Sequence, residues 1–312
     1  MTKAKTLSTS KRVASSMTTA VCIGLSVLLL TFSDVIRKSI YDGLVFSFTT
    51  VIPTLFPFFV LSDLWAYGLN FDDRGRPGRA FSYLFGISGC ALSAALCGMV
   101  CGFPLGVKLA MELYNQKRIG RGEAERLCGF ANNPSAAFVI SGVGCGIIGS
   151  LKIGILLYFS VILSAIMVGV IFRRQEDASQ KFKDISQQSF NLPTSIGSAG
   201  LASVNVTACI CFFSAVIGLI SHITKNDVAS ALISPFFEVT CSVKMIGESS
   251  LFSHRIGLPF IAFALGFSGF SVHMQAFTFF PPEISKGKYL LMKLIQGIFA
   301  FFTMLLLSPF SK

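Results

Sequence analysis

Ionisable side chains within long apolar runs are the residues of this sequence best placed to do chemistry. Lys108 and His273 each follow a glycine-rich interruption of such a run, and Glu238 lies in an apolar stretch that also holds Lys244. A charged group inside a bilayer is costly unless it faces a cavity, pairs or reaches the interface, so each is a candidate for function. Lys108 and His273 could hold a carboxylate between them, and Glu238 could carry a coupling proton.

Polar and small residues around the same interruptions extend the set. Asn132, Asn133 and Ser135 flank Pro134, where a helix must loosen and leave backbone groups free. The candidate solute-binding residues are Lys108, Asn132, Asn133, Ser135, Glu238, Ser268, Ser271, His273 and Gln275. The candidate hairpin breaks are Gly102, Pro104, Gly106, Gly266 and Gly269.

Each of these candidates also has a structural explanation. Lys108 can reach the interface from the end of a hairpin, and Glu238 can pair with Lys244 or Lys108. His273 and the asparagines can serve as hydrogen-bonded links between helices. The nine cysteines lie in apolar segments without metal-site spacing, and the three histidines are scattered. We therefore expect no catalytic residue, no metal ion and no cofactor beyond a coupling ion, H⁺ or Na⁺.

The composition identifies the environment of these residues. The chain has 312 residues, of which 53% are apolar and only 13% charged, and its mean hydropathy is +0.70. Soluble domains carry roughly 25% charged residues, so a soluble enzyme and a disordered chain are both excluded. The net charge of +11 lies in short loops between apolar runs, which is typical of the positive-inside rule and not of nucleic-acid binding. The sequence predicts an all-α polytopic membrane protein in contact with the lipid bilayer.

The apolar runs predict about 8–10 transmembrane or half-spanning helices. The run 80–107 is interrupted near Gly102, and the basic stretch 108–126 that follows belongs in the cytoplasm, so we expect a re-entrant hairpin. Non-helical backbone survives at membrane depth only where it is buried in protein or lines a cavity. The predicted parts are an N-terminal anchor helix in 1–42, a first gate-like repeat with its following helix in 43–172, a polar cytoplasmic loop in 173–198 and a second gate-like repeat in 199–312.

An internal repeat supports two similar halves. Gly106-Val107-Lys108 matches Ser271-Val272-His273 at an offset of 165 residues, and the same offset relates 119–122 to 284–287. Secondary transporters are often built from such repeats, with interrupted helices meeting at the binding site. We expect broken-helix units near 80–114 and 256–282 to face each other, and positive-inside counting gives them the same orientation.

Several of these motifs carry a family resemblance. The stretches 101–108 (Cys-Gly-Phe-Pro-Leu-Gly-Val-Lys), 123–127 and 130–135 (Phe-Ala-Asn-Asn-Pro-Ser) resemble the nucleoside-recognition gate domain. More narrowly, they resemble sporulation integral membrane proteins of the YlbJ type. The stretches 235–240 and 266–275 resemble the second-half motifs of that family, so the resemblance runs from about residue 45 to 310.

The resemblance implies a function. Proteins of this type are similar to concentrative nucleoside transporters and are implicated in moving dipicolinic acid into the developing spore. It implies secondary transport of a small planar anion across a bacterial cell membrane, specifically the outer forespore membrane, with a homo-oligomer possible. A nucleoside transporter, or a membrane protein for assembly or signalling, are the alternatives. Nucleoside transporters have an apolar residue and a serine where this chain has Asn133 and Pro134. An intramembrane enzyme is disfavoured, because neither His-Glu-x-x-His nor Gly-x-Ser-x-Gly occurs.

Overall fold

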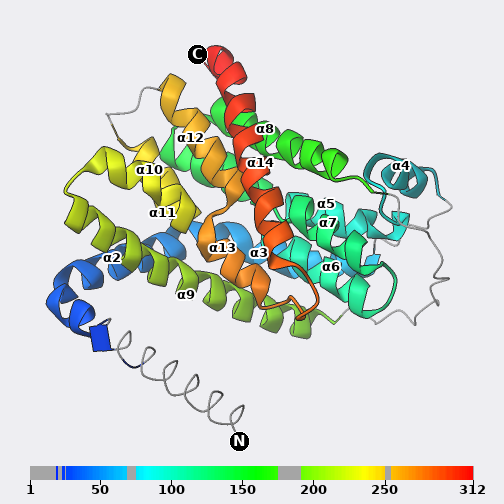
Figure 1. The fold of residues 1–312 in the computed structure, drawn as a ribbon, viewed down its shortest axis with the longest axis horizontal. Coiled ribbons are helices and arrows are strands. Elements are labelled where there is room, and N and C mark those ends of the chain that lie inside the picture. Colours follow the sequence, from blue (N-terminus) through cyan, green and yellow to red (C-terminus); the bar gives the residue numbers. More distant parts are fainter. Residues whose placement is uncertain are drawn as a thin grey trace, which may run out of the picture.

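All regular structure in the described part of the chain is helical (Figure 1). The computed structural model describes residues 19, 23–24, 26–68, 75–174, 191–249 and 254–311. Most of the predicted anchor helix and most of the predicted loop 173–198 lie outside these residues. The predicted all-α polytopic fold class is confirmed.

Five helical segments within the described residues are long and apolar enough to cross a membrane. Three are single helices: α8 (Leu151–Ile171), α9 (Leu192–Thr224) and α14 (Lys286–Leu307). The segment Ser33–Leu61 combines α2 (Ser33–Phe46), η1 (Ser47–Val51) and part of α3 (Ile52–Gly68). The segment Arg255–Phe277 combines α12 (His254–Phe267) and α13 (Gly269–Phe277). Helix α4 (Arg76–Phe85) and the helix Gly89–Val100 together make a sixth span when they are counted as one bent unit. The second of them consists of η2 (Gly89–Ala91) and α5 (Leu92–Val100). They meet at 97°, so the run 80–107 is not one straight helix, as predicted.

The same order of elements occurs twice along the chain. In each case two short helices form a hairpin, a helix with a break in its middle follows, and a long helix ends the set. The first unit is α5, α6 (Leu105–Asn115), α7 (Arg121–Ala131), η3 (Phe138–Ile147) and α8, and the second unit is α10 (Asp227–Phe237), α11 (Val239–Gly247), α12, α13 and α14. Leu92 and Asp227, which begin the two hairpins, are 135 residues apart, as are Leu151 and Lys286, which begin the long helices.

This correspondence differs from the predicted pairing at 165 residues. That offset aligned α6, which is half of a hairpin, with α13, which is half of a broken span. The two sequences match because both are helices that start after a glycine-rich break and end before a basic loop. The hairpin α10–α11 was not recognised, because residues 228–247 have the composition of one apolar segment.

The two hairpins enter the molecule from opposite ends. Helices α5 to α7 lie at one end and α10 and α11 at the other (Figure 1). The predicted common orientation holds for α6 and α13, because their C-terminal ends lie near each other: Tyr114 Oη, at the end of α6, donates over 3.2 Å to Glu283, in the loop after α13. The helices that follow also meet there, where Lys288 Nζ of α14 donates to Glu125 Oε2 of α7 over 2.8 Å. It does not hold for the units as wholes, because their hairpins are opposed.

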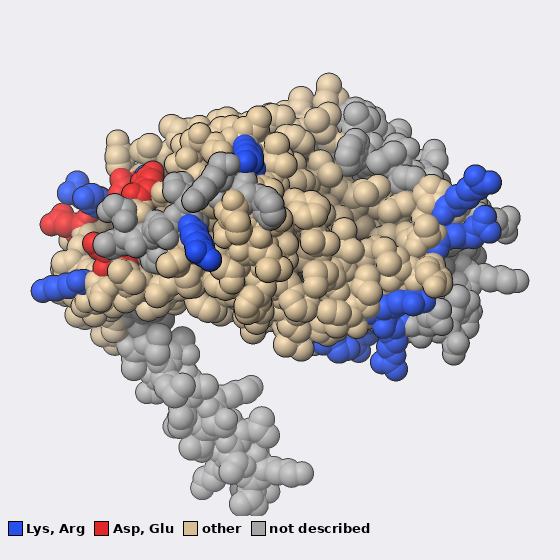
Figure 2. All heavy atoms as spheres, turned by 90° about the horizontal axis from the view of Figure 1, so that it is seen from above, with Lys and Arg blue, Asp and Glu red and all other residues tan. Residues whose placement is uncertain are grey.

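Surface charge distinguishes the two ends. On the face drawn in Figure 2, the end that holds α4 to α7 shows only Lys and Arg, whereas the opposite end shows both signs. The positive-inside rule places the end whose drawn face shows only basic residues in the cytoplasm. We refer to it below as the basic end.

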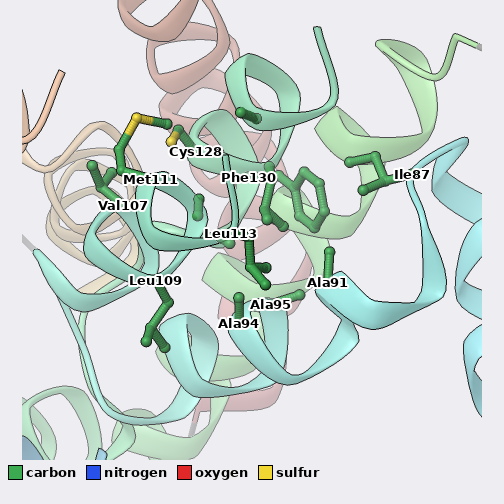
Figure 3. Close-up of a cluster of buried hydrophobic side chains, with 14 of the residues drawn as sticks. Ile87, Ala91, Ala94, Ala95, Val107, Leu109, Met111, Leu113, Cys128 and Phe130 are labelled. Carbon is green, nitrogen blue, oxygen red and sulfur yellow. The ribbon is translucent and has the colours of Figure 1, made fainter. Parts of the chain in front are cut away.

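The core at the basic end allows its helices to approach closely. Ala91, Ala94 and Ala95 are at most 2% exposed, and they face the side chains of α6 and α7, including Leu113 and Phe130 (Figure 3). Small residues at helix interfaces bring backbones together, which drives association where the hydrophobic effect is weak. This packing fixes the first hairpin against α7.

Candidate functional site

The tip of the first hairpin is pressed against the break of the first broken helix. A Cβ atom on Gly98 or Gly106 would lie 2.1 or 2.2 Å from the carbonyl oxygen of Ala131. Gly102 has a φ of +99°, and a Cβ there would lie 2.9 Å from Cβ of Ser135. The predicted breaks at Gly102, Pro104 and Gly106 therefore lie at the hairpin tip or at the start of α6, against the non-helical residues 132–135.

The second unit repeats this contact with different residues. The hairpin α10–α11 turns at Glu238, and the broken helix α12–α13 is interrupted at Ser268. Gly269 has a φ of +72°, and a Cβ there would lie 3.0 Å from the carbonyl oxygen of Phe237. The predicted break at Gly266 is corrected: this residue lies inside α12, where a Cβ would lie 3.1 Å from Cα of Gly297. The glycine serves helix packing, and the break follows two residues later.

A small enclosed space, which we call the central cavity, lies between the two hairpin contacts. It is lined by Val51, Leu55, Phe103, Ser135, Phe138, Val206, Ile210, Glu238, Val239, Thr240, Ser271, Val272 and Gln275. Four of the predicted solute-binding residues are thus brought together from both units: Ser135, Glu238, Ser271 and Gln275. Its volume of about 20 Å³ is close to that needed by a single water molecule.

Several polar atoms of the cavity lack protein partners. The carboxylate of Glu238, whose residue is 1% exposed, accepts hydrogen bonds from Thr240 Oγ1 and from the backbone N–H of Cys241. Ser271 Oγ and Gln275 Oε1 are buried and have no hydrogen-bond partner. Leaving such atoms unpaired is costly, so they are candidate ligand contacts.

Four helices begin at the cavity. Phe103 directly precedes the first turn of α6, and Ser135 Oγ accepts a bond of 3.1 Å from the backbone N–H of Phe138 in η3. Glu238 caps the start of α11 through its bond from the Cys241 N–H, and Ser271 lies in the first turn of α13. Helix N-termini carry partial positive charge. The backbone therefore makes this cavity favourable for negative charge, part of which Glu238 supplies.

A second buried cluster, the interunit network, joins the first broken helix to α14. Asn132 Nδ2 donates to Tyr289 Oη over 2.8 Å, and His273 Nδ1 lies 3.4 Å from the same oxygen. Lys293 Nζ donates to the backbone carbonyl of Asn132 over 2.7 Å. These contacts place Asn132 and His273 in one network, which meets at the tyrosine hydroxyl.

The network continues along α14 to the second asparagine. Lys293 Nζ also donates to Gln296 Oε1 over 2.7 Å, and Gln296 Nε2 donates to Asn133 Oδ1 over 2.6 Å. Asn133 Nδ2 donates to the carbonyl of Phe130 at the end of α7. The six members, Asn132, Asn133, His273, Tyr289, Lys293 and Gln296, are all at most 1% exposed.

Two predicted residues lie outside both groups. Lys108 is half-buried on α6, and it is neither among the residues that line the cavity nor in the interunit network. Ser268 Oγ donates to the carbonyl of Leu265 within its own helix. His273 is enclosed by Phe267, Phe270 and Tyr289. An anion clamp between Lys108 and His273 remains a prediction.

Sequence reasoning missed Tyr289, Lys293 and Gln296. Residues 289–310 have the composition of an ordinary apolar span, which hides three polar side chains on one helix. The signal for Lys293 was present: it is a single cation in such a span, and the rule that selected Lys108 applies to it equally.

Together, the helices and the two opposed units define a multi-pass α-helical integral membrane protein with a polar centre. Comparison gives a more specific relationship. The chain is similar to the sporulation integral membrane protein YlbJ of Bacillus subtilis (strain 168), with 29% identity over 320 residues that cover 86% of this chain and 76% of that protein. The predicted resemblance to YlbJ-type membrane proteins is confirmed, and a role as a membrane protein of sporulation is supported. No family model matches the chain, so the gate-domain assignment remains a prediction. No solved structure matches it.

Proposed function

We propose that this protein is a secondary transporter that moves a small planar anion across a bacterial membrane during sporulation. Dipicolinate is the solute that the family resemblance suggests, and the outer forespore membrane is the corresponding location. One observation carries the proposal: helix starts from two opposed units surround one buried, largely apolar cavity to which both units also contribute polar residues.

The architecture supports transport. Interrupted helices of secondary transporters meet near the middle of the membrane, and their half-helix N-termini point at anionic groups of the solute. The cavity contains residues of both hairpins and both broken helices, so a relative movement of the units changes its size. At about 20 Å³ it is closed around no more than a water-sized group. Admission of a ring with two carboxylates requires the units to separate.

Positive charge beyond the helix starts comes from Lys293 in this proposal. Its ammonium group is bonded to the carbonyl of Asn132, three residues before Ser135 of the cavity. Separation of the units at the break 132–135 would present this ammonium to an entering carboxylate. Lys108, four residues along α6 from the hairpin tip, would approach the same side of the solute.

A nucleoside-like solute is the second candidate. Asn132 Oδ1 is buried without a hydrogen-bond partner, and asparagine amides suit the polar edge of a neutral base. A binding site for a neutral nucleoside would need no cationic side chain. The presence of Lys293 therefore favours an anionic solute.

Equilibrium binding to the purified protein in detergent distinguishes these candidates. We expect dipicolinate to bind saturably, uridine not to displace it, and Ser271→Ala to weaken it. Ser242→Ala serves as the control, because Ser242 is a buried hydroxyl on α11 outside the cavity. Saturable binding of uridine with no binding of dipicolinate would favour the nucleoside function. Binding of neither solute would contradict transport of both classes and favour an assembly role.

A further inference from the structure

We propose that the side-chain amine of Lys293 binds the coupling proton, so that one proton enters the interunit network with each anionic solute. This inference deepens the proposed function, on which it rests, by naming the coupling ion and the residue that carries it. The lone pair of the amine accepts the proton from solvent when the solute binds and returns it to solvent after the solute has left, and no other bond forms or breaks.

Lys293 is buried within α14 without an acidic partner. None of the ion pairs found among the described residues includes it. Helices α7, α8 and α12 pack against α14, and the acids they carry are Glu123 and Glu125 of α7. Glu123 accepts bonds from two backbone N–H groups, and Glu125 is paired with Lys288. A buried charge is costly unless it is paired, so only neutral oxygens compensate this ammonium until a carboxylate arrives.

The remaining titratable groups on these helices, on α13 and on α14 supply no negative charge at neutral pH. His273 of α13 reaches the network through Tyr289 Oη, and Cys128 of α7 lies in the same hydrophobic cluster as Tyr289. All three are neutral or cationic in their ordinary range. The others are Tyr158, whose hydroxyl donates to the carbonyl of Met99, and the cationic residues Arg121, Arg126, Lys152, Arg255, Lys286 and Lys288.

The hydrogen bonds of Lys293 are compatible with both protonation states. Its nitrogen donates to the carbonyl of Asn132 and to Gln296 Oε1, over 2.7 Å each. An ammonium has three N–H donors and a neutral amine has two, so the neutral form keeps both bonds. The network therefore need not rearrange when the proton is lost, and the third N–H of the charged form is available to a solute carboxylate.

The position of Lys293 ties its protonation to the movement of the units. Asn132 belongs to the break of the first unit and Lys293 to α14 of the second, so separation at this contact admits solvent and solute to the nitrogen together. A carboxylate bonds more strongly to an ammonium than to a neutral amine. Proton binding and solute binding therefore strengthen each other by the same factor. Once the solute has left, the unpaired ammonium favours release of its proton.

Calorimetric titration of dipicolinate into the purified protein in detergent counts these protons. At a pH of about 8 the carboxylates of dipicolinate are ionised, so any proton taken up on binding goes to the protein. Titrations in two buffers of different ionisation enthalpy, with choline chloride as the only added salt, give the number of protons bound per solute. We expect the parent to take up close to one proton per dipicolinate.

Variants assign the proton to a residue. Lys293→Arg should bind dipicolinate without proton uptake, because a guanidinium keeps its charge at any pH of interest. Lys293→Met should bind at least tenfold more weakly, and also without proton uptake. The control Lys152→Met removes an exposed lysine at the start of α8 and should take up protons as the parent does. Glu238→Gln tests the rival carrier in the central cavity and should also retain the uptake.

The inference is overturned if the parent binds dipicolinate without taking up a proton, a result that would leave the proposed solute standing and require another coupling ion. Uptake that persists in Lys293→Arg overturns it as well, and assigns the proton to Glu238 if Glu238→Gln abolishes the uptake. Should Lys293→Arg fail to fold, Lys293→Met decides at higher dipicolinate concentrations. Absence of dipicolinate binding by the folded parent would refute the proposed solute and this inference with it.

Discussion

At the scale of single residues, Lys293 is the side chain that most constrains function. Its ammonium is fully buried, and its two bonds go to neutral oxygens, the carbonyl of Asn132 and the amide of Gln296. The carbonyl of Asn132 lies just past the C-terminal end of α7, where the helix dipole is negative. Such an environment tolerates a buried cation and keeps it beside the break of the first broken helix.

Replacement of this charge should weaken solute binding. Loss of one charge-assisted contact costs on the order of 1.5–3 kcal/mol, so Lys293→Met should reduce dipicolinate affinity by roughly ten- to a hundredfold. Lys152→Met is the matched control, because Lys152 is exposed at the start of α8. Binding isotherms for the two variants and the parent provide the comparison. Equal affinity of Lys293→Met and the parent would show that this ammonium is structural.

The predicted clamp gives a second residue-scale test. If Lys108 and His273 hold the anion, Lys108→Met and His273→Phe should each cost on the order of 1.5–3 kcal/mol of binding free energy and leave folding intact. Both variants can be measured in the same dipicolinate binding assay, with size-exclusion chromatography as the check on folding. If both bind as the parent does, snorkelling of Lys108 and packing of His273 account for these residues.

The outcome at single residues follows from what a local pattern can reveal. Ser135, Glu238 and Ser271 could be predicted because each lies beside a visible helix breaker or stands out in an apolar run. Tyr289 and Gln296 could not, since a tyrosine or glutamine in a span has many harmless roles. Their function depends on which helix faces α14, and no local signal reports that contact.

At the scale of elements, the hairpins depend on glycine at their contacts with the broken helices. Gly98 and Gly106 sit against the carbonyl of Ala131, and Gly269 sits against the backbone of Phe237. The neighbouring atoms are backbone atoms, which cannot rotate away as a side chain can. The breaks themselves could be predicted from sequence, but Gly266 was misassigned because glycine serves close helix packing as well as unwound backbone.

Adding one methyl group at such a contact should loosen the first hairpin. In Gly106→Ala the new Cβ would lie 2.2 Å from the Ala131 carbonyl oxygen, and overpacking typically costs about 1–3 kcal/mol. Gly200→Ala on α9 is the control, because a Cβ there meets nothing within 4 Å and alanine favours a helix by up to about 1 kcal/mol. Thermal unfolding in detergent should show a lower Tm for Gly106→Ala only. Equal Tm values for Gly106→Ala and the parent would mean that the hairpin accommodates the added methyl group without loss of stability.

At the scale of the whole molecule, the two ends differ in how firmly the units are joined. At the basic end, Glu125 on α7 accepts bonds from Lys288 Nζ, the Ser285 N–H and Arg121 Nε, of 2.8, 3.0 and 3.1 Å. At the opposite end a wide cleft of about 680 Å³ lies between α2, α9 and the hairpin α10–α11, and its lining includes Asp42, Asp227 and Lys244. The conformation therefore combines a tied basic end with an opposite end that has a wide cleft between the helices.

Uptake of labelled dipicolinate into vesicles reconstituted with the purified protein tests the central claim most directly. The account predicts saturable uptake that exceeds uptake by protein-free vesicles, rises with an inward gradient of the coupling ion, H⁺ or Na⁺, is unaffected by excess uridine and falls at least tenfold in Lys293→Met. The control Ser242→Ala should transport as the parent does. Uptake by protein-containing vesicles no faster than by protein-free vesicles, with or without the gradient, would contradict the assignment as a transporter of this anion.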